Sequence, residues 1–398
     1  MTRPALLYLV HRIPFPPNKG DKVRSFHLLK HLAEQFEVHL GTFVDHPDDW
    51  QHVPALDQWC ASVHVGRLDP RRGRLKSLTG LVTGEALTLP YYRDRGLADW
   101  VRQTVAKHGI RQAVVFSGAM AQYLDGLDLD RTFIDFCDVD SAKWTQYGDS
   151  RPWPMSWLYR REGRLLGRFE QHWAARADHA SFVTRSETDL FLRAAPTLGD
   201  KTLVVENGVD ADFFSPAHGG ESPYGAGGPH LVFAGAMDYW PNIDAACWFA
   251  NDILPRIRSR HPGAHFHIVG MNPAPSVKAL ADLEQVHVTG TVPDVRPYVH
   301  HADVVVAPLR VARGIQNKVL EAMAMARPVV VSSASAVGLR GVPGQTHEVA
   351  ETPDDYVEAI ERCLGEAAAD MGLAARDVVL RGYAWPAHLA AVSRSLMA

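Results

Sequence analysis

Cysteine is scarce in this sequence and forms no cluster. The 398 residues include four cysteines, none of them close to another cysteine or to a Cys/His group: Cys60, Cys137, Cys247 and Cys363. A zinc site or a disulfide framework needs such clustering, so we expect neither a bound metal nor a disulfide-stabilised domain. The scattered thiols favour a reducing compartment, which we take to be the cytoplasm.

Long apolar runs and an excess of one charge are also lacking. No run of about 18 apolar residues occurs, which is the length that a membrane-spanning helix needs. The apolar part of the opening segment, Ala5 to Val10, is too short for a signal peptide, and we interpret it as a strand. Forty-one Lys and Arg against forty-five Asp and Glu leave a net charge of -4, without the basic excess of a nucleic-acid-binding protein.

The composition is that of a globular protein, and its length suggests two domains. Short apolar runs alternate with segments of helical spacing, which predicts parallel sheets covered by helices. Helical spacing follows the first run, at Phe26, Leu29, Leu32, Ala33 and Phe36. The strands predicted in the first half are Leu6 to Val10, Val38 to Phe43, Ser62 to Val65, Ala113 to Phe116, Thr132 to Phe136 and His179 to Val183.

The same alternation begins again in the second half. The strands predicted there are Thr202 to Val205, Leu231 to Ala234, His265 to Val269, Val286 to Thr289, Val304 to Ala307 and Pro328 to Val331. We therefore predict an α/β fold of two doubly wound, Rossmann-like domains, residues 1–200 and 201–380, with a hinge near Asn207. A C-terminal helix in residues 381–398 is expected to pack back towards the first domain.

One strand-loop-helix segment carries the residue types of a phosphate site. A glycine-bearing loop with Arg313 and Gly314 follows a predicted strand, and Asn317, Lys318 and Glu321 share one face of the helix that comes next. The N-terminus of a helix attracts phosphate, Lys318 adds a full charge, and Glu321 can accept hydrogen bonds from ribose hydroxyls. The alternative is a surface helix with a Lys/Glu pair.

The second half resembles glycosyltransferase family 4, whose GT-B fold places two Rossmann-like domains across a cleft. The motifs that carry the resemblance are Val205-Glu-Asn207-Gly208-Val-Asp210, Val232-Phe-Ala-Gly235, His267-Ile-Val-Gly270, Val288-Thr-Gly290-Thr-Val292, and Ala302-Asp303-Val-Val-Val-Ala-Pro308 before Leu320-Glu321-Ala-Met-Ala. In the first half, the segments His11 to Arg24 and Phe136 to Trp144 resemble the exosortase-associated sugar transferases of exopolysaccharide gene clusters, as does Gly235 to Asn242 in the second.

The resemblance implies retaining transfer of a sugar from a nucleotide diphosphate sugar to an acceptor hydroxyl, in exopolysaccharide biosynthesis and without a tightly bound metal or other cofactor. The acceptor would be a saccharide or a lipid-linked saccharide. By position, Glu321 would bind the ribose and the main chain around Val292 would meet the base. The other expected donor-binding residues are Gly20, Gly235, Gly270, Gly314, Ile315 and Asn317.

The sequence departs from the family pattern where charge is needed. Arg313 stands where the family has the first glutamate of its Glu-x7-Glu pattern, and the usual Arg and Lys after Gly235 are missing. A departing diphosphate needs cationic stabilisation, so we predict that Arg313 and Lys318 supply it as catalytic residues. Two alternatives stay open for Arg313: a solvated loop position, or a contact to the carboxylate of an acidic donor sugar.

Acceptor-side candidates lie in the first domain. Asp138 and Asp140 follow a predicted strand, and we predict that Asp138 assists catalysis and that Asp140 contacts the acceptor. Arg24, beyond the first strand, is a second acceptor-side candidate. Alternatively, the two aspartates only cap a helix or hold a turn.

Residues 151–176 mix six arginines with apolar and aromatic side chains, and Arg67 to Lys76 is a shorter segment that is also basic. Such segments could rest on the anionic inner face of the cell membrane, or 151–176 could be an amphipathic helix that covers the first sheet. Two rival functions remain: a sugar-nucleotide epimerase of the same fold, and a non-catalytic nucleotide-sugar binding module.

Overall fold

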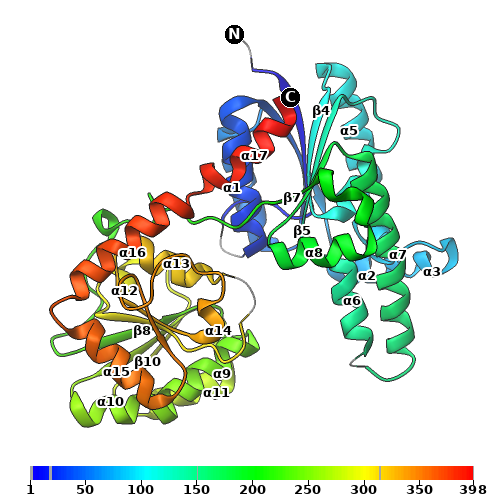
Figure 1. The fold of residues 1–398 in the computed structure, drawn as a ribbon. Coiled ribbons are helices and arrows are strands. Elements are labelled where there is room, and N and C mark those ends of the chain that lie inside the picture. Colours follow the sequence, from blue (N-terminus) through cyan, green and yellow to red (C-terminus); the bar gives the residue numbers. More distant parts are fainter. Residues whose placement is uncertain (1–2, 18–19, 150, 313–314, 398) are drawn as a thin grey trace. The chain divides into compact units, whose positions relative to one another are not determined.

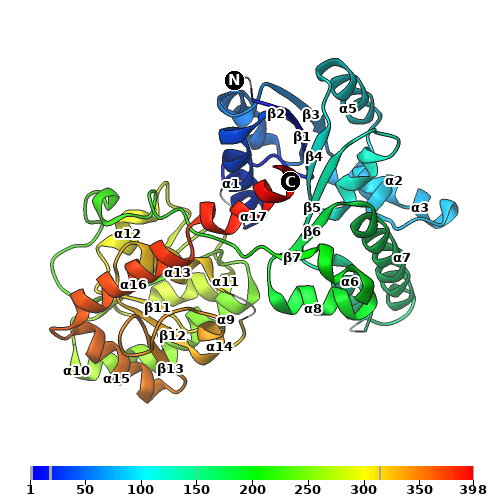
Figure 2. The same ribbon diagram turned by 45° about the horizontal axis from the view of Figure 1, so that its top comes forward.

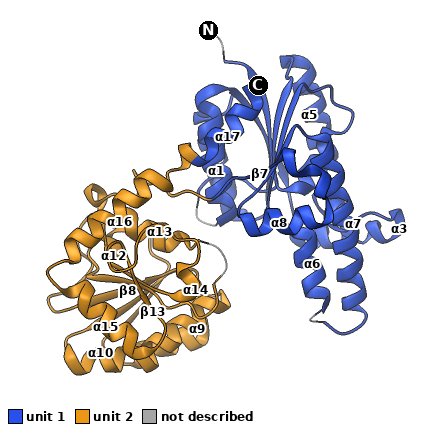
Figure 3. Cartoon of the chain, in the orientation of Figure 1, with its two compact units in different colours: residues 1–206, 388–398 blue, residues 207–387 orange. Residues whose placement is uncertain are grey.

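The computed structural model describes residues 3–17, 20–149, 151–312 and 315–397. The chain forms two compact units (Figure 3): unit 1 is Met1–Glu206 with His388–Ala398, and unit 2 is Asn207–Ala387. The divisions thus lie at 206/207 and 387/388, where the sequence suggested 200/201 and 380/381.

Unit 1 is built on a parallel sheet with the order β3-β2-β1-β4-β5-β6-β7. Its strands are β1 (Ala5–Val10), β2 (Glu37–Val44), β3 (Ser62–Arg67), β4 (Gln112–Phe116), β5 (Arg131–Cys137), β6 (His179–Phe182) and β7 (Thr202–Val204). The side chains of Leu6, Leu7 and Leu9 in the central strand β1 are wholly buried. Both faces of this sheet are therefore covered, as a parallel sheet requires.

Helices lie on both faces of this sheet. Figures 1 and 2 show α1 and α17 on one face and α5 and α7 on the other. The helices of unit 1 are α1 (Gly20–Gln35), α2 (Pro70–Ser77), α3 (Thr79–Thr83), α4 (Thr88–Tyr92), α5 (Arg95–His108), α6 (Asp140–Asp149), α7 (Met155–Arg176) and α8 (Arg185–Ala194). The first predicted helix, recognised from Phe26 to Phe36, is α1.

The predicted strand Thr202 to Val205 exists, but the sequence assigned it to the wrong sheet. As β7 it pairs in parallel with β6, Ala180 opposite Thr202 and Phe182 opposite Val204. It therefore closes the sheet of unit 1 and does not open that of unit 2. Its apolar pattern predicts a strand but carries no information about its pairing partner.

Unit 2 contains a parallel sheet with the order β10-β9-β8-β11-β12-β13. Its strands are β8 (His230–Ala234), β9 (His265–Val269), β10 (Val286–Gly290), β11 (Val304–Ala307), β12 (Val329–Ser332) and β13 (Glu348–Ala350). The sequence predicted all of these except β13. In both sheets the strand order reverses beside the first strand, which is the arrangement predicted for doubly wound domains.

The helices of unit 2 are α9 (Trp240–Trp248), α10 (Leu254–Arg260), α11 (Pro275–Lys278), α12 (Arg296–His300), α13 (Asn317–Ala324), α14 (Ser333–Ala336), α15 (Pro353–Leu364) and α16 (Ala368–Gly382). Helix α13 is the predicted phosphate-site helix, and its residues Val319, Leu320 and Met323 are buried in the core. None of the helices in the described part of the chain is long and apolar enough to cross a membrane.

The last helix, α17 (Trp385–Met397), ends in unit 1. Figures 1 and 2 both show it beside α1, where His31 Nε2 lies 2.7 Å from Ser393 Oγ. Its Leu389, Val392 and Leu396 are buried. Residues 388–397 are thus part of the packing of unit 1.

Candidate functional site

In unit 2 the strand order reverses between β8 and β11. Open α/β sheets bind ligands at the carboxyl ends of the strands where the order reverses. Two segments lie there: the loop that begins at Gly235 after β8, and helix α13, which follows β11. The second of these is the segment that the sequence selected.

Glycines allow the ends of β8 and β9 to approach each other closely. A Cβ on Gly270 would lie 1.6 Å from the carbonyl oxygen of Gly235, and both residues have φ of 156°. Gly235 N–H donates to Val269 O, at 2.9 Å. A larger residue at position 270 would therefore force the strand ends apart, whereas one at position 235 would displace the side chains of Lys318 and Asn242.

Lys318 reaches from α13 to the loop after β8. Its Nζ donates to Asn242 Oδ1 at 2.6 Å, and Asn242 Nδ2 donates to Ala236 O at 2.8 Å. The ammonium also lies 4.4 Å from the ring centroid of Phe233 and 2.8 Å from where a Cβ on Gly235 would be. Thus a cation does lie beside the loop that lacks the family's Arg and Lys.

The charge of Lys318 is poorly compensated. Its hydrogen-bond partner is a neutral amide, and burial lowers the pKa of Lys318 to about 7, against the charge of Glu321. Burial likewise raises the pKa of Glu321 to about 7, against the charge of Lys318. The ammonium of Lys318 is thus desolvated without a full counter-charge, so an anion bound beside it would be stabilised.

The start of α13 lies where the sequence placed it, within three residues. Helix α13 begins at Asn317 after the N-cap Gln316, whose side chain makes no capping hydrogen bond. Asn317 and Ile315 are both partly exposed. Arg313 and Gly314, the other two residues predicted at this helix end, lie outside the described residues.

Val292 follows β10 and is partly exposed while it packs against the core of unit 2. Strand β10 lies two strands away from β8, where the strand order reverses, so Val292 lies towards the edge of the sheet. A nucleotide base at the outer end of the donor site would lie on this side. In unit 1, Gly20 is the first residue of α1, and it is exposed, with no atom within 4 Å of where its Cβ would be.

Unit 1 has a cavity at its own point of reversal, between β1 and β4. The cavity measures about 520 Å³ and reaches His11 directly after β1 and Ser117 directly after β4. Its other walls are rich in aromatic rings: Tyr91 and Tyr92 from α4, Trp144 and Tyr147 from α6, and Tyr159 from α7. Aromatic walls with a few polar groups are typical of a site for a small organic ligand.

His11 is a residue of this cavity that sequence reasoning missed. Its ring stacks on Phe116, and its Nε2 lies 3.5 Å from Asp21 Oδ2. Its Nδ1 is buried and has no hydrogen-bond partner among the residues that the structure describes. A buried ring nitrogen without a partner is costly, and a ligand in the cavity could satisfy it. A single histidine in a loop carries no sequence signal of this kind.

Asp138 and Asp140 lie together after β5 and share a cation. Lys143 Nζ donates to Asp138 Oδ2 at 2.7 Å and to Asp140 Oδ1 at 3.1 Å. Burial alone would lower the pKa of Lys143, but the two carboxylates raise it above its ordinary value. Asp140 and Lys143 line the cavity of unit 1, whereas Asp138 is not among its lining residues.

Arg24 has a different place from the one expected. It is 1% exposed and makes a paired contact to Asp135 in β5, with Nε and Nη2 at 2.8 and 3.1 Å from the two carboxylate oxygens. Burial alone would lower the pKa of Arg24, but the charge of Asp135 raises it. A guanidinium enclosed in this way cannot touch an acceptor. It holds α1 to β5.

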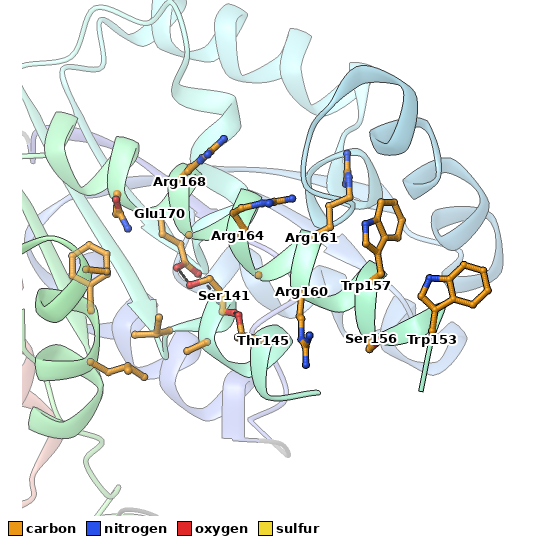
Figure 4. A pocket seen from close by; sticks show the side chains of 18 residues that line it. Ser141, Thr145, Trp153, Ser156, Trp157, Arg160, Arg161, Arg164, Arg168 and Glu170 are labelled. Atoms are coloured by element: carbon orange, nitrogen blue, oxygen red, sulfur yellow. Dashed lines mark hydrogen bonds between the residues drawn. The ribbon is translucent and has the colours of Figure 1, made fainter. Parts of the chain in front are cut away.

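A larger cavity of about 890 Å³ lies between α6, α7 and α8 (Figure 4). Glu170 accepts hydrogen bonds there from the backbone N–H and the hydroxyl of Ser141, and burial raises the pKa of Glu170 to about 7. The cavity includes neither of the strand ends at the point of reversal, His11 or Ser117. We therefore take the smaller cavity as the candidate site of unit 1.

Comparison with known proteins supports this reading of the fold. Residues 228–366 match the family model described as glycosyl transferases group 1. No curated protein matches the sequence significantly. Among solved structures, the chain is similar to sucrose-phosphate synthase from Thermosynechococcus elongatus, with 16% identity, a TM-score of 0.68 and 98% of each chain covered.

Two further structures of similar extent share the fold. The Anabaena protein HepE in complex with UDP is 15% identical, with a TM-score of 0.65 and 99% of each chain covered. A glycosyltransferase from Rickettsia africae is 12% identical, with a TM-score of 0.65 and coverage of 99% of this chain and 98% of the other. The predicted fold of two Rossmann-like domains, GT-B, is confirmed.

Proposed function

We propose that this chain, a GT-B glycosyltransferase by its fold and its matched domain, moves a sugar from a nucleotide diphosphate sugar to an acceptor hydroxyl with retention of anomeric configuration. The observation that carries the proposal is the placement of Lys318, an undercompensated cation between the Gly235 loop and α13. The motifs favour glycosyltransferase family 4, and within it the exosortase-associated transferases of exopolysaccharide biosynthesis.

Unit 2 holds the donor in this proposal. The diphosphate lies at the N-terminal end of α13, beside Lys318 and the Gly235 loop, with Glu321 on the ribose and the main chain near Val292 on the base. Uridine is the base we favour, because HepE, which shares the fold, was solved with UDP and with UDP-glucose. We expect no metal or other cofactor to take part.

The reaction needs charge at the leaving group. The bond between the anomeric carbon and the diphosphate oxygen breaks, and its electron pair stays on the diphosphate. The acceptor oxygen bonds to the same carbon, and its proton passes to the departing diphosphate. Lys318, together with Arg313, stabilises the growing negative charge, which a preorganised cation does better than water. Of these two, Lys318 lies in the described part of the chain, and its neutral Asn242 partner leaves its charge available.

Unit 1 holds the acceptor, a saccharide or a lipid-linked saccharide. Its cavity offers aromatic walls, the carboxylate of Asp140 and the free ring nitrogen of His11. These groups match the alternating apolar faces and hydroxyl edges of a sugar. We place Asp140 on an acceptor hydroxyl and Asp138 behind Lys143, and we propose that the protein works in the cytoplasm at the inner face of the cell membrane.

A nucleotide panel tests the donor site. A ligand at 100 times its dissociation constant stabilises the folded state by about 2.7 kcal/mol, so the matching nucleoside diphosphate should raise the melting temperature. UDP, GDP and ADP are compared in thermal-shift measurements, with Glu321→Ala as the test variant and the exposed Glu366→Ala as its control. The proposal fails if no diphosphate at millimolar concentration shifts the wild type. Product analysis then separates transfer from release of an isomerised sugar nucleotide.

A further inference from the structure

Two short segments of unit 1 expose large apolar side chains. Of the nineteen exposed large apolar residues in the described part of the chain, eight lie within residues 75–82 and 147–157. They are Leu75, Leu78, Leu81, Val82, Tyr147, Trp153, Met155 and Trp157. Val82 is 90% exposed and Trp153 is 80% exposed. Such clustering on a chain surface marks an interaction site.

Both segments project from the body of the unit. Figures 1 and 3 show α3 at one edge of unit 1 and the α6–α7 hairpin extending beyond the sheet. Figure 4 shows the rings of Trp153 and Trp157 at the start of α7, directed outward from the helix. The apolar groups therefore stand at the ends of protruding elements, where a flat surface could reach them.

The two segments lie within longer stretches that carry a strong positive charge. Residues 67–83 contain five Lys and Arg against one acid, and residues 147–168 contain five Arg against two acids. One of those acids, Glu162, is buried. The arginines that are exposed and pair with no described carboxylate are Arg67, Arg71, Arg74, Arg151, Arg164 and Arg168. A surface that is both apolar and basic matches an anionic lipid bilayer, whose headgroup–acyl boundary takes aromatic rings and whose head groups take arginine.

Hydrogen bonds join the two segments into one surface. Arg161 of α7 donates to the carbonyl oxygens of Gly80 and Glu85, at 2.7 and 3.1 Å. Glu162 accepts from the backbone N–H and the hydroxyl of Thr88, at 2.9 and 2.7 Å. Because α7 is tied to the first turn of α3, to the loop after α3 and to the start of α4, the two protruding elements keep a fixed relation to each other.

The cavity proposed for the acceptor lies between these segments. One end of the cavity is formed by His11 and Ser117, at the carboxyl ends of the central strands. Arg74 and Ser77 of α2 and Tyr147 of α6 line the same cavity, and they belong to the two segments that carry the exposed apolar groups. The cavity thus extends from the carboxyl ends of β1 and β4 to the apolar and basic surface.

We propose that unit 1 docks on an anionic lipid bilayer through residues 67–83, 147–149 and 151–168, and that the cavity between them receives the head group of an acceptor anchored in that bilayer. The second half of this proposal rests on the proposed function. The first half does not, since it concerns only the surface of unit 1.

Vesicle flotation tests the docking. The full chain is mixed with vesicles of phosphatidylcholine alone or with phosphatidylglycerol added, at low and high salt. We expect binding to the anionic vesicles only, with release at high salt. Arg71→Glu with Arg164→Glu should lower binding about tenfold or more, since each basic residue near an anionic surface contributes about a fivefold preference. Trp153→Ser with Trp157→Ser should lower binding to a similar extent.

The matched control is Leu373→Ser with Leu380→Ser, which removes two exposed leucines from α16 of unit 2 and should leave binding unchanged. The thermal unfolding transition of each variant, measured without ligand, reports whether it remains folded. Equal binding to both kinds of vesicle, loss of binding in the α16 control, or a dimer in solution that the tryptophan variant dissolves would each overturn the docking.

The acceptor half is tested with two acceptors of the same saccharide, one soluble and one carried on a lipid in the vesicles. Loss of docking should reduce transfer to the lipid-carried acceptor by about tenfold, following the bound fraction, and leave transfer to the soluble one unchanged. Equal loss on both acceptors overturns the link between surface and cavity. Vesicle binding without any sugar transfer would sink the proposed function and leave the docking intact.

Discussion

Buried and partly buried cations in the two units differ in what neutralises them. In unit 1, Arg12, Lys22 and Arg24 of the first loop and helix each contact a carboxylate, at 2.6 to 2.8 Å: Asp21, Asp49 and Asp135. In unit 2, Lys318 occupies a comparable place, on the helix beside the point of strand reversal, yet donates to the neutral Asn242.

The pKa values report the same difference. Asp135 raises the pKa of Arg24, whereas burial lowers the pKa of Lys318 to about 7. Burial alone would also raise the pKa of Asp21, but His11 and Arg12 lower it below its usual range. The charges of Arg12, Lys22 and Arg24 are thus neutralised within unit 1. Among these four cations, Lys318 is the one whose hydrogen-bond partner is neutral, and it is the one that we propose binds a ligand.

Removing Arg24 should give the largest effect on stability. Arg24→Met leaves Asp135 buried without its partner, which typically costs about 3–5 kcal/mol of unfolding free energy. Urea denaturation measures the loss. The double variant Arg24→Met with Asp135→Asn should recover most of it, because neither charge is then left alone. If the single variant is as stable as wild type, the pair does not hold α1 to β5.

Removing Lys318 should act on turnover instead. Lys318→Met should leave the free energy of unfolding within about 1 kcal/mol of wild type, because a poorly compensated charge is lost. It should lower kcat by about 100-fold, the usual cost of one group that stabilises developing charge. Steady-state kinetics and urea denaturation on the same protein decide this. If Lys318→Met lowers the free energy of unfolding as much as Arg24→Met does, Lys318 also has a structural role and the proposed difference between the two units is wrong.

Diphosphate binding should be coupled to a proton on Lys318. With a pKa of about 7, the free amine is mostly neutral at pH 8, and a bound diphosphate raises that pKa. Binding at pH 8 therefore takes up a proton, and affinity should fall by up to about tenfold per pH unit as pH rises above 7. Glu321, with its pKa also raised to about 7, is already ionised at pH 8 and adds little.

Calorimetry in phosphate and in Tris buffer at pH 8 measures this uptake, because the two buffers release protons with different heats. Lys318→Met should abolish the difference between buffers. The same heat in both buffers for the wild-type protein would mean that Lys318 is already charged before the ligand arrives.

The smallest effect is expected in the cavity of unit 1. His11→Phe keeps the ring that stacks on Phe116 and removes the unpartnered Nδ1. The KM for the acceptor should rise several-fold, in line with about 1 kcal/mol for one hydrogen bond, while the thermal shift with UDP stays the same. A weakened UDP response with an unchanged acceptor KM would place His11 at the donor.

The fold could be predicted from the sequence because parallel strands buried on both faces read as short Val-, Ile- and Leu-rich runs. Strand β12, for example, is Val329–Ser332 where Pro328 to Val331 was expected. The three-residue β13 is too short for such a run. Strand β7 was recognised but assigned to the wrong sheet, since pairing depends on the packing of the whole unit.

The candidate site was predictable where its residues are close in sequence. Lys318 and Glu321 were found from their spacing on one helix. The Lys318 contact to Asn242 spans 76 residues, and the Arg24 contact to Asp135 spans 111, so neither partner could be foreseen. For this reason Arg24 was predicted to contact the acceptor, although its charge is neutralised by Asp135 in the core.

The place of α17 bears on the order in which the protein is made. Residues 388–398 complete unit 1 against α1, but they leave the ribosome after the whole of unit 2. Unit 2, residues 207–387, is continuous and can fold as soon as it emerges, whereas the face of α1 that receives Leu389 and Ser393 must wait uncovered. Unit 1 is therefore translated first, but its packing is completed only after unit 2 has been synthesised.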